Sequence, residues 1–384
     1  DPLVIVPVEE VGQYGGTARV FSNSLTGYGE AECLIGFEGL VKLGPDTTSV
    51  IPNIAKSWKY TDGGKTLTIY LRKGIKWSDG VPFTADDILF WWEDVVLNDE
   101  LTPVKPVTWS PGGKLMTVEK VDNYTIRMKF SVSHPFAILY LAHGWGTQAS
   151  CYYPKHYSKK FHPKYTPIEE LNKRAKAEGF DNWWQLFGKY NGFFGGGGAN
   201  VEIGAPTLQA FMVAKKGIDY LMAERNPYYW KIDIAGNQLP YIDRIQVGIV
   251  TDTEMMNMKA ITGEADYACM QTKLENYTLY KENEKKGNYR VLLWQRVQGA
   301  DVAYQCNLTY KDDTVLRDIF RDVRFRRALS LAINRDEINQ MLYYGMATPR
   351  QACPIPSSPY FEEQFANAYI KYDPKEANRL LDDM

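Results

Sequence analysis

The sequence predicts a mixed α/β protein of more than one domain, on three observations. The chain has 384 residues, which exceeds one typical domain. Residues 245–263 show the alternation of a strand and then the pattern of a helix, an order that suits a mixed sheet. The tract GFFGGGG at 192–198 is typical of a flexible connector, since no GK[ST] follows it as in a phosphate loop, and it indicates a domain boundary.

The clearest local pattern lies at residues 51–96. Alternating Leu67, Ile69 and Leu71 predict the second strand of a hairpin, closed by the turn DGGK. Thr84 followed three residues later by Asp87 is typical of a capping box. The helix that it opens has an apolar face made of Ile88, Trp91, Trp92 and Val95.

Other elements are predicted by alternation, caps and glycine stops. Before the central segment we expect, in order, a short strand into which residues 11–20 lead, a polar loop at 22–33 and a helical turn at 37–41. After it we expect a hairpin turning at 122–123, a helix to 142 and a second capping box at 166–169. A hairpin over 208–225, a strand at 245–249 and a helix ending at 263 follow. The last predicted elements are strands at 291–297 and 302–308 and helices beginning after Asp322, Arg335 and Asp373.

The composition excludes several classes of protein. The net charge is −2 and the pI about 6.2, so nothing calls for nucleic acid or an anionic surface. The arginines at 317–335 alternate with acids, which favours an ion-paired, solvated face. No apolar run reaches the roughly 18 residues of a membrane span, and any secretory leader has already been removed from a chain that opens at Asp1.

The residue patterns predict no catalytic or metal centre. The four histidines lack HxxxH or HxH spacing, and no GxSxG occurs. Asp86 and Asp87 fall in the first turn of a helix, where the helix dipole accounts for them, and the pair at 93–94 is expected to be solvated. The methionines at 255–258 are expected to be core. The cysteines are also expected to be core. They are odd in number and lie far apart, so their spacing indicates neither a zinc site nor a disulfide framework: Cys33, Cys151, Cys269, Cys306 and Cys353.

Several stretches together resemble the family 5 extracellular solute-binding proteins, which are the peptide and oligosaccharide receptors of ABC importers. The longest are PNIAKSW at 52–58, LRKGIKWSDG at 71–80 and PFTADDI at 82–88. Further matches are FEGL at 37–40, NPYYW at 226–230, GEAD at 263–266, DVRFRRALSLAINR at 322–335 and YDPKEANRLLDDM at 372–384. The segment GAPTL at 204–208 departs from the family's pattern.

The resemblance implies a two-lobe fold like that of periplasmic binding proteins, with an extra α+β subdomain in the first lobe. We expect the first-lobe α/β domain in residues 1–40 and 204–297, the supporting subdomain in 41–203, and the start of the second lobe in 298–384. The chain would cross between the lobes near Gly299. Because the family continues past the last match, we expect the second lobe to be incomplete here.

The resemblance also places a ligand site on two segments, to which the sequence adds Trp145 as a further hypothesis. In peptide receptors of the family the loop before FEGL runs along the ligand, which implicates Leu25, Thr26, Gly27 and Tyr28. Just past the crossover, Tyr304 would form a wall and Asn307 a polar contact. Trp145, in the turn HGWG, looks like an exposed aromatic ring. The alternatives are an ordinary surface loop for the first segment and plain sheet residues for Tyr304 and Asn307.

The implied function is capture of a peptide or oligosaccharide outside the cytoplasm, by closure of two lobes, and delivery to the permease of an ABC importer. We expect membrane association through an anchor absent from this chain, and no cofactor, metal or nucleic acid. A secreted glycoside hydrolase is the alternative, because two separated carboxylates cannot be recognised in sequence. The high aromatic content, 14%, suits either a core or flat contacts with sugars and side chains. Turnover of an oligosaccharide would distinguish the hydrolase from the receptor.

Overall fold

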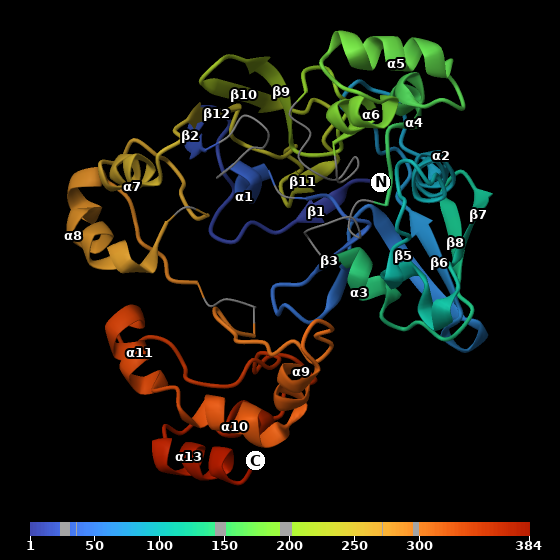
Figure 1. Cartoon of the computed structure of the whole chain (residues 1–384). Helices are drawn as coiled ribbons and strands as arrows, with labels where there is room; N and C mark the ends of the chain where they lie inside the picture. Colours follow the sequence, from blue (N-terminus) through green and yellow to red (C-terminus); the bar gives the residue numbers. More distant parts are fainter. Residues whose placement is uncertain (24–30, 36, 143–150, 193–201, 271, 295–298) are drawn as a thin grey trace. The chain divides into compact units, whose positions relative to one another are not determined.

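The computed structural model divides the chain into two compact units (Figure 1). It describes residues 1–23, 31–35, 37–142, 151–192, 202–270, 272–294 and 299–384. The first unit comprises Asp1–Gly44, Ser49–Thr272 and Asn283–Tyr289. The second comprises Pro45–Thr48, Lys273–Glu282 and Arg290–Met384.

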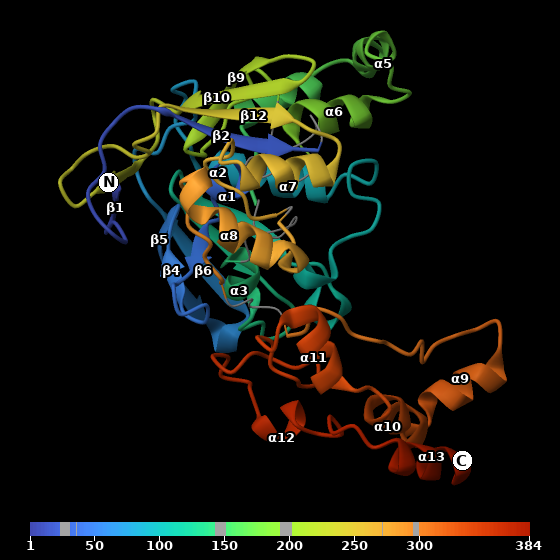
Figure 2. The same cartoon turned by 90° about the vertical axis from the view of Figure 1, so that its left-hand side faces the viewer.

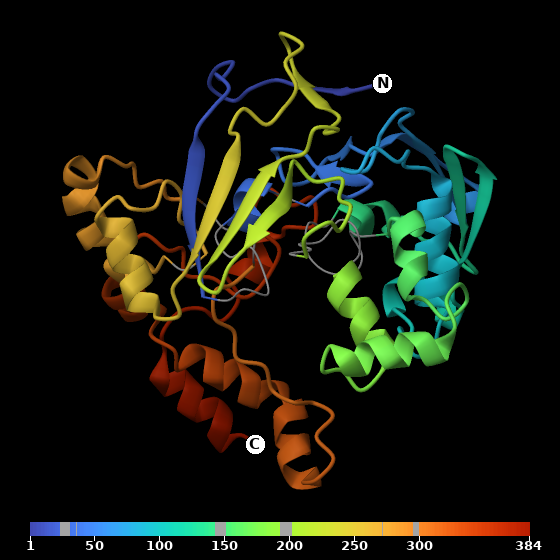
Figure 3. The ribbon, with the colours of Figure 1, turned by 90° about the horizontal axis from the view of Figure 1, so that it is seen from above.

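One sheet of the first unit is mixed and has the strand order β2-β12-β10-β9. Strand β12 pairs parallel with β2 and antiparallel with β10, which forms a hairpin with β9. Figures 2 and 3 show the four strands side by side. Alternating residues such as Val20, Leu221 and Val247 are buried. The bounds are β2 Thr17–Ser22, β9 Phe211–Lys216, β10 Tyr220–Arg225 and β12 Arg244–Ile249. The hairpin predicted over 208–225 is therefore confirmed, although its first strand begins only at Phe211.

The other large sheet of the first unit is antiparallel, with the order β5-β6-β8-β7. Both predicted hairpins are confirmed, and Leu67 and Ile69 are fully buried. Thr84 and Asp87 form the predicted capping box at the start of helix α2, which packs on β7. The bounds are β5 Ala55–Thr61, β6 Thr66–Leu71, β7 Thr117–Asp122, β8 Thr125–Lys129 and α2 Ala85–Leu89.

Short strand pairs and helices complete the first unit. β1 (Leu3–Ile5) pairs with β11 (Lys231–Asp233), and β3 (Val41–Leu43) with β4 (Val50–Pro52). The helices are α1 Glu32–Ile35, α3 Ala137–Ala142, α4 Lys155–Ser158, α5 Ile168–Ala177, α6 Trp183–Asn191 and α7 Thr253–Ile261, with the 3-10 turns η2 Asp62–Gly64, η4 Val107–Trp109, η5 Pro111–Gly113 and η6 Lys159–Phe161. One continuous apolar core runs through both large sheets.

Among the described residues of the second unit, all the regular secondary structure is helical. Helix α10 packs against α13 through Ala328, Leu331 and Ala377. Asp322 and Asp373 cap these two helices, as predicted. Two of the arginines at 317–335 pair with acids, Arg317 with Asp318 and Arg324 with Asp322. The bounds are η7 Leu274–Asn276, α9 Thr314–Arg321, α10 Val323–Leu331, α11 Arg335–Tyr343, α12 Glu363–Ala366 and α13 Pro374–Asp382, while α8 Tyr277–Gly287 contributes residues to both units.

Two predicted helix starts are wrong. The helical turn expected at 37–41 is not formed: a short helix, α1, ends at Ile35, and β3 begins at Val41. Between them Glu38 is drawn into a buried set of hydrogen bonds, described below. The capping box at 166–169 is also absent, since the helix begins at Ile168 with Pro167 as its N-cap and the Thr166 hydroxyl donates to Lys159 O instead.

The predicted solvation of the acidic pair at 93–94 is wrong for Asp94, which is buried. The cause is a change of helix type: α2 continues into the π-helical segment η3 (Phe90–Val96), in which Leu97 N–H donates to Trp92 O, five residues back. The altered turn leaves Asp94 inside, where its carboxylate accepts hydrogen bonds from Lys164 Nζ at 2.6 Å and Tyr165 Oη at 2.7 Å.

The core assignments of the methionines and cysteines are only partly correct. Met256 is buried, but Met255 and Met258 are about half exposed because they lie on the outer face of α7. Cys151 is buried, whereas Cys269, Cys306 and Cys353 have intermediate exposure. The side chain of Cys33 lies outside the described residues.

The burial of Asp87 should make the stability of the fold depend on pH. Burial raises the pKa of its carboxyl to about 6, although the N–H groups of Thr84 and Lys155 donate to it at 2.9 and 3.0 Å. Since the folded pKa exceeds the model-compound value of 3.8, the unfolded chain ionises first, so stability is lost as pH rises from about 4 to about 6. The expected loss is about 3 kcal/mol.

Asp87→Asn removes this ionisation. Urea denaturation of the wild type and of Asp87→Asn gives the difference between their free energies of unfolding. As the pH is lowered from 7 to 4, we expect this difference to change in favour of the wild type. A difference for Asp87→Asn that did not change with pH would contradict the prediction.

Candidate functional site

Two of the predicted site residues are described by the structure. Tyr304 and Asn307 lie in the second unit, on exposed, irregular backbone. The predicted strands 291–297 and 302–308 are not formed in their described residues, 291–294 and 302–308, because no described strand lies beside them to complete a ladder. The remaining predicted residues lie outside the described residues: Leu25, Thr26, Gly27, Tyr28 and Trp145.

The segment 299–308, which we call the crossover segment, is fixed at both ends within the second unit. At its start Gly299 passes so close to the backbone of Cys353 that a Cβ atom would lie 2.3 Å from Cys353 O. At its end the Leu308 carbonyl accepts a hydrogen bond from Arg321 Nε of α9 at 2.8 Å. Between these anchors Tyr304 is 85% exposed. The segment therefore presents its side chains on a held backbone.

Asn307 is oriented by a local turn. Its side-chain oxygen accepts hydrogen bonds from Thr309 N–H and Thr309 Oγ1, both at 3.1 Å, and Tyr310 N–H donates to its carbonyl. With the oxygen occupied, the amide Nδ2 group donates to no residue that the structure describes. Asn307 thus has a positioned amide donor that no described residue uses.

A buried ionic cluster around Glu38 joins the parts of the first unit. Lys231 Nζ donates to both carboxylate oxygens of Glu38, at 2.9 and 2.8 Å. Tyr229 Oη donates at 2.8 Å and Asn53 Nδ2 at 2.9 Å, while Tyr152 Oη donates to the Glu38 backbone carbonyl. The side chain of Glu38 is 2% exposed and that of Lys231 is 8% exposed. These groups hold β11, the FEGL segment and the turn before β5 together.

The cluster is structural rather than catalytic. Burial opposes ionisation of Glu38, but the attraction of Lys231 and Lys42 and the donated hydrogen bonds outweigh it and lower the pKa of Glu38 to about 2. A carboxylate so fully paired and enclosed has no access to a substrate. The sequence analysis did not predict this cluster. The signals available were a single acid, Glu38, in the apolar segment FEGLV and a single lysine, Lys231, in the apolar segment YWKI.

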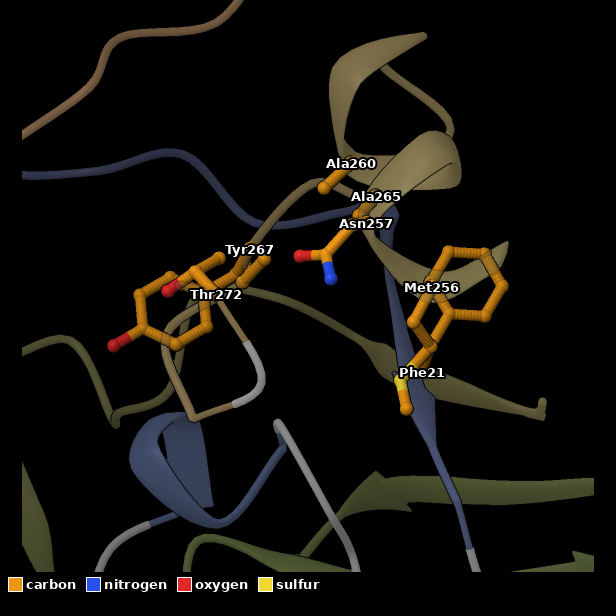
Figure 4. Close-up of a pocket in the computed structure, with 8 residues that line it drawn as sticks. Phe21, Met256, Asn257, Ala260, Ala265, Tyr267 and Thr272 are labelled. Carbon is orange, nitrogen blue, oxygen red and sulfur yellow. The ribbon is translucent and has the colours of Figure 1, made fainter. Parts of the chain in front are cut away.

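A small cavity lies between α7 and strand β2 (Figure 4). Its volume is about 10 Å³, enough for about one water molecule. Phe21, Met256, Asn257 and Tyr267 line it, together with Ala260, Ala265, Ala268 and Thr272. It is too small for a sugar ring or a peptide residue, so it is no solute site.

The titratable groups show no centre for metal chemistry. Within the described parts of the chain, no three His, Cys, Asp or Glu side chains gather to hold an ion. His156 Nε2 lies 2.7 Å from Asp79 Oδ2, and His162 Nε2 lies 2.8 Å from the Asp94 carbonyl, so both rings have structural partners. Among the described helices none is long and apolar enough to span a bilayer.

Comparison with known proteins identifies the class of this fold. The sequence pattern of one family, the bacterial extracellular solute-binding proteins, family 5 Middle, matches residues 49–384 of this chain. The chain belongs to this family. The resemblance noted in the motifs and the α/β fold of the periplasmic-binding-protein type are thereby confirmed.

Three proteins are similar to this chain over most of its length. The periplasmic alpha-galactoside-binding protein of Rhizobium meliloti (strain 1021) is 30% identical over 368 residues, which cover 92% of this chain and 48% of that protein. A structure of an oligopeptide-binding protein OppA is 41% identical, with a TM-score of 0.77 over 100% of this chain and 59% of that one. The binding protein MelB of Agrobacterium fabrum C58, solved with stachyose, is 25% identical, with a TM-score of 0.69 over 97% and 56%.

The chain spans about half the length of the relatives it matches. Because the matched regions cover nearly all of this chain, the relatives contain much additional sequence. The activity, solute and partners of the whole protein are therefore treated below as proposals.

Proposed function

We propose that this protein is an extracytoplasmic receptor that captures a peptide or an oligosaccharide and delivers it to the permease of an ABC importer. The observation that carries the proposal is the family match over residues 49–384. The names of the relatives, an alpha-galactoside-binding protein and an oligopeptide-binding protein, support both classes of solute. Association with the membrane through an anchor outside this chain belongs to the same proposal.

The proposed ligand contacts are Tyr304 and Asn307 in the second unit, together with Leu25, Thr26, Gly27, Tyr28 and Trp145, which lie outside the described residues. Closure of the lobes on the solute requires contacts that form only in the closed state. The exposed ring of Tyr304 and the positioned amide of Asn307 are suited to such contacts.

A binding protein is supported over a glycoside hydrolase, because the relatives are named for what they bind. The test is a thermal-shift screen of the full-length protein against a panel of peptides and a panel of oligosaccharides, followed by chromatography of the incubated ligands. A bound ligand raises the unfolding temperature and should be recovered intact. Hydrolysis products, or no binding to either panel, would overturn the proposal.

We expect Tyr304→Ala and Asn307→Ala each to weaken binding of the solute found in that screen by about 5- to 10-fold. The loss reflects a removed ring contact in one variant and a removed hydrogen-bond donor in the other. Isothermal titration calorimetry measures it, and Tyr360→Ala is the matched control because Tyr360 is an exposed tyrosine elsewhere in the second unit. Unchanged affinity in both variants would show that these residues are not at the site.

A further inference from the structure

We infer that the exposed apolar faces of α11 and α9, both in the second unit, are packing surfaces for polypeptide that lies outside residues 1–384 in the full-length protein (Figure 1). The partner is then a segment of the same polypeptide that has an apolar face of its own. The inference goes beyond the proposed function, because it concerns how the second unit is completed and not what the receptor binds.

The first observation is that α11 turns a polar side inward and an apolar side outward. Ile338, Met341 and Leu342 share one face of the helix, since the last two lie three and four residues after the first. They are 41%, 71% and 63% exposed. The buried residue of α11 is Asn339, whose amide group donates to the Ala347 carbonyl at 2.9 Å and accepts from the Ala347 N–H at 3.0 Å. A helix normally buries its apolar stripe, so this face of α11 lacks the layer that would cover it.

Helix α9 shows the same deficit independently. Its apolar residues lie at spacings that place them on one side of the helix: Val315, Leu316, Ile319 and Phe320. None of the residues of α9 is buried, and Val315 is 69% exposed. Phe320 meets Phe325 of α10, with the ring centroids 6.0 Å apart, so the side of α9 is covered only in part. Two helices of one unit therefore present apolar surface without a matching layer.

The length of the relatives indicates what covers these faces. The alpha-galactoside-binding protein matches 92% of this chain with 48% of its own length, and the OppA structure matches 100% with 59%. A segment joined to the same polypeptide is present at a far higher effective concentration than a second molecule, so it occupies an apolar face before another copy can. The sequence that the relatives have beyond the matched regions is therefore the source of the covering layer.

The charges of α11 do not suit a lipid surface. Helices that lie on a membrane carry Lys and Arg on their polar side, where they meet anionic headgroups. The first turn of α11 contains the acids Asp336 and Glu337. Its single base, Arg335, donates to the Ser330 carbonyl at 2.8 Å. An apolar protein layer needs no cation, so the composition of α11 favours protein over lipid as the partner.

Methionine oxidation tests the inference on the full-length protein without any substitution. Hydrogen peroxide oxidises accessible methionines, and mass spectrometry of the peptides gives a rate at each position. We expect Met341 to react at least about tenfold more slowly in the folded protein than in urea. Met255 of α7, which is 52% exposed, is the reference and should be slowed no more than about twofold. Oxidation of Met341 in the folded protein at the rate found in urea would overturn the inference.

Two further measurements identify the covering partner. Light scattering gives the mass of the full-length protein, and the oxidation is repeated after dilution. Protection of Met341 that persists in a monomer supports cover by the same polypeptide. Protection that is lost on dilution would assign the face to a second copy, and protection that arises only with phosphatidylglycerol vesicles would assign it to a membrane. Either result would overturn the proposed partner.

A matched pair of substitutions gives an independent readout. Met341→Gln keeps the length of the side chain but places an amide against the covering layer, and we expect it to lower the melting temperature of the full-length protein by about 3 °C. Met255→Gln makes the same change on an exposed face of α7 and should shift the melting temperature by less than about 1 °C. Equal shifts in the two variants would contradict a covered face at Met341.

Discussion

Lys231→Met is expected to lower the free energy of unfolding by about 3–5 kcal/mol, because it leaves the Glu38 carboxylate buried without its main counter-charge. In the native protein Lys231 Nζ contacts both carboxylate oxygens within 2.9 Å. The remaining donors are the neutral groups of Asn53 and Tyr229 and the more distant ammonium of Lys42, which is partly exposed. Chemical denaturation followed by tryptophan fluorescence would measure the loss.

Two companion variants show whether the uncompensated charge is the cause. Glu38→Gln/Lys231→Met removes both charges and should recover a large part of the lost stability. Lys42→Met should cost at most about 1 kcal/mol, because Lys42 Nζ lies 3.3 Å from Glu38 and its side chain is 34% exposed. A double variant no more stable than Lys231→Met would point to packing rather than charge.

The pH dependence of the same cluster has a definite sign. The pKa of Glu38 is lowered to about 2 from 4.5, so the folded state favours the ionised form. Its contribution to stability is present above about pH 4.5 and is lost as the pH falls toward 2. Lys231→Met should reduce or abolish this loss, because burial then opposes ionisation of Glu38 without its main counter-charge.

Trp183→Ala is expected to cost about 3–5 kcal/mol, because it opens a cavity in the core beneath α6. Trp183 is 1% exposed, and its ring centroid lies 5.5 Å from that of His162 and 6.4 Å from that of Phe187. Its Nε1 also donates to Glu100 Oε1 at 3.2 Å, a bond that the variant loses. Urea denaturation would measure the difference.

The next residue in the chain supplies the control. Trp184 has the same side chain on the same helix but is 39% exposed, so Trp184→Ala should cost less than about 1 kcal/mol. Trp183→Phe should lie between the two alanine variants, since it keeps most of the ring volume. Equal losses at both tryptophans would mean that α6 does not pack as described.

The predictable parts of this fold are those specified by neighbouring residues. The hairpin closed by DGGK and the caps at Thr84, Asp322 and Asp373 depend on contacts a few residues apart, and each formed as expected. The Glu38 cluster differs, because Lys231 lies 193 residues from Glu38 and no local pattern connects them. Long-range pairing of this kind decides the backbone at 37–41 against its local preference.

The same distinction explains the remaining errors. The π-helical turn at Phe90–Val96 moves Asp94 inward, and an α-helical pattern cannot reveal a change of helix type. The sequence at 302–308 has the alternation of a strand, but a strand also needs a hydrogen-bonding neighbour. For the ligand site, Tyr304 and Asn307 came from the family resemblance, whereas their exposure became visible only in three dimensions.

The small core between α10 and α13 bears on how binding affinity is set. The first unit is held by one extensive core, whereas the buried apolar cluster of the second contains Ala328, Leu331 and Ala377. Elements with few buried contacts open locally at a lower free energy than the rest of a protein. The crossover segment, which holds the proposed contacts Tyr304 and Asn307, belongs to this less protected unit. Under the proposed function, binding would have to quench these fluctuations, and the affinity would depend on the rigidity of the helices as well as on the side chains that touch the solute.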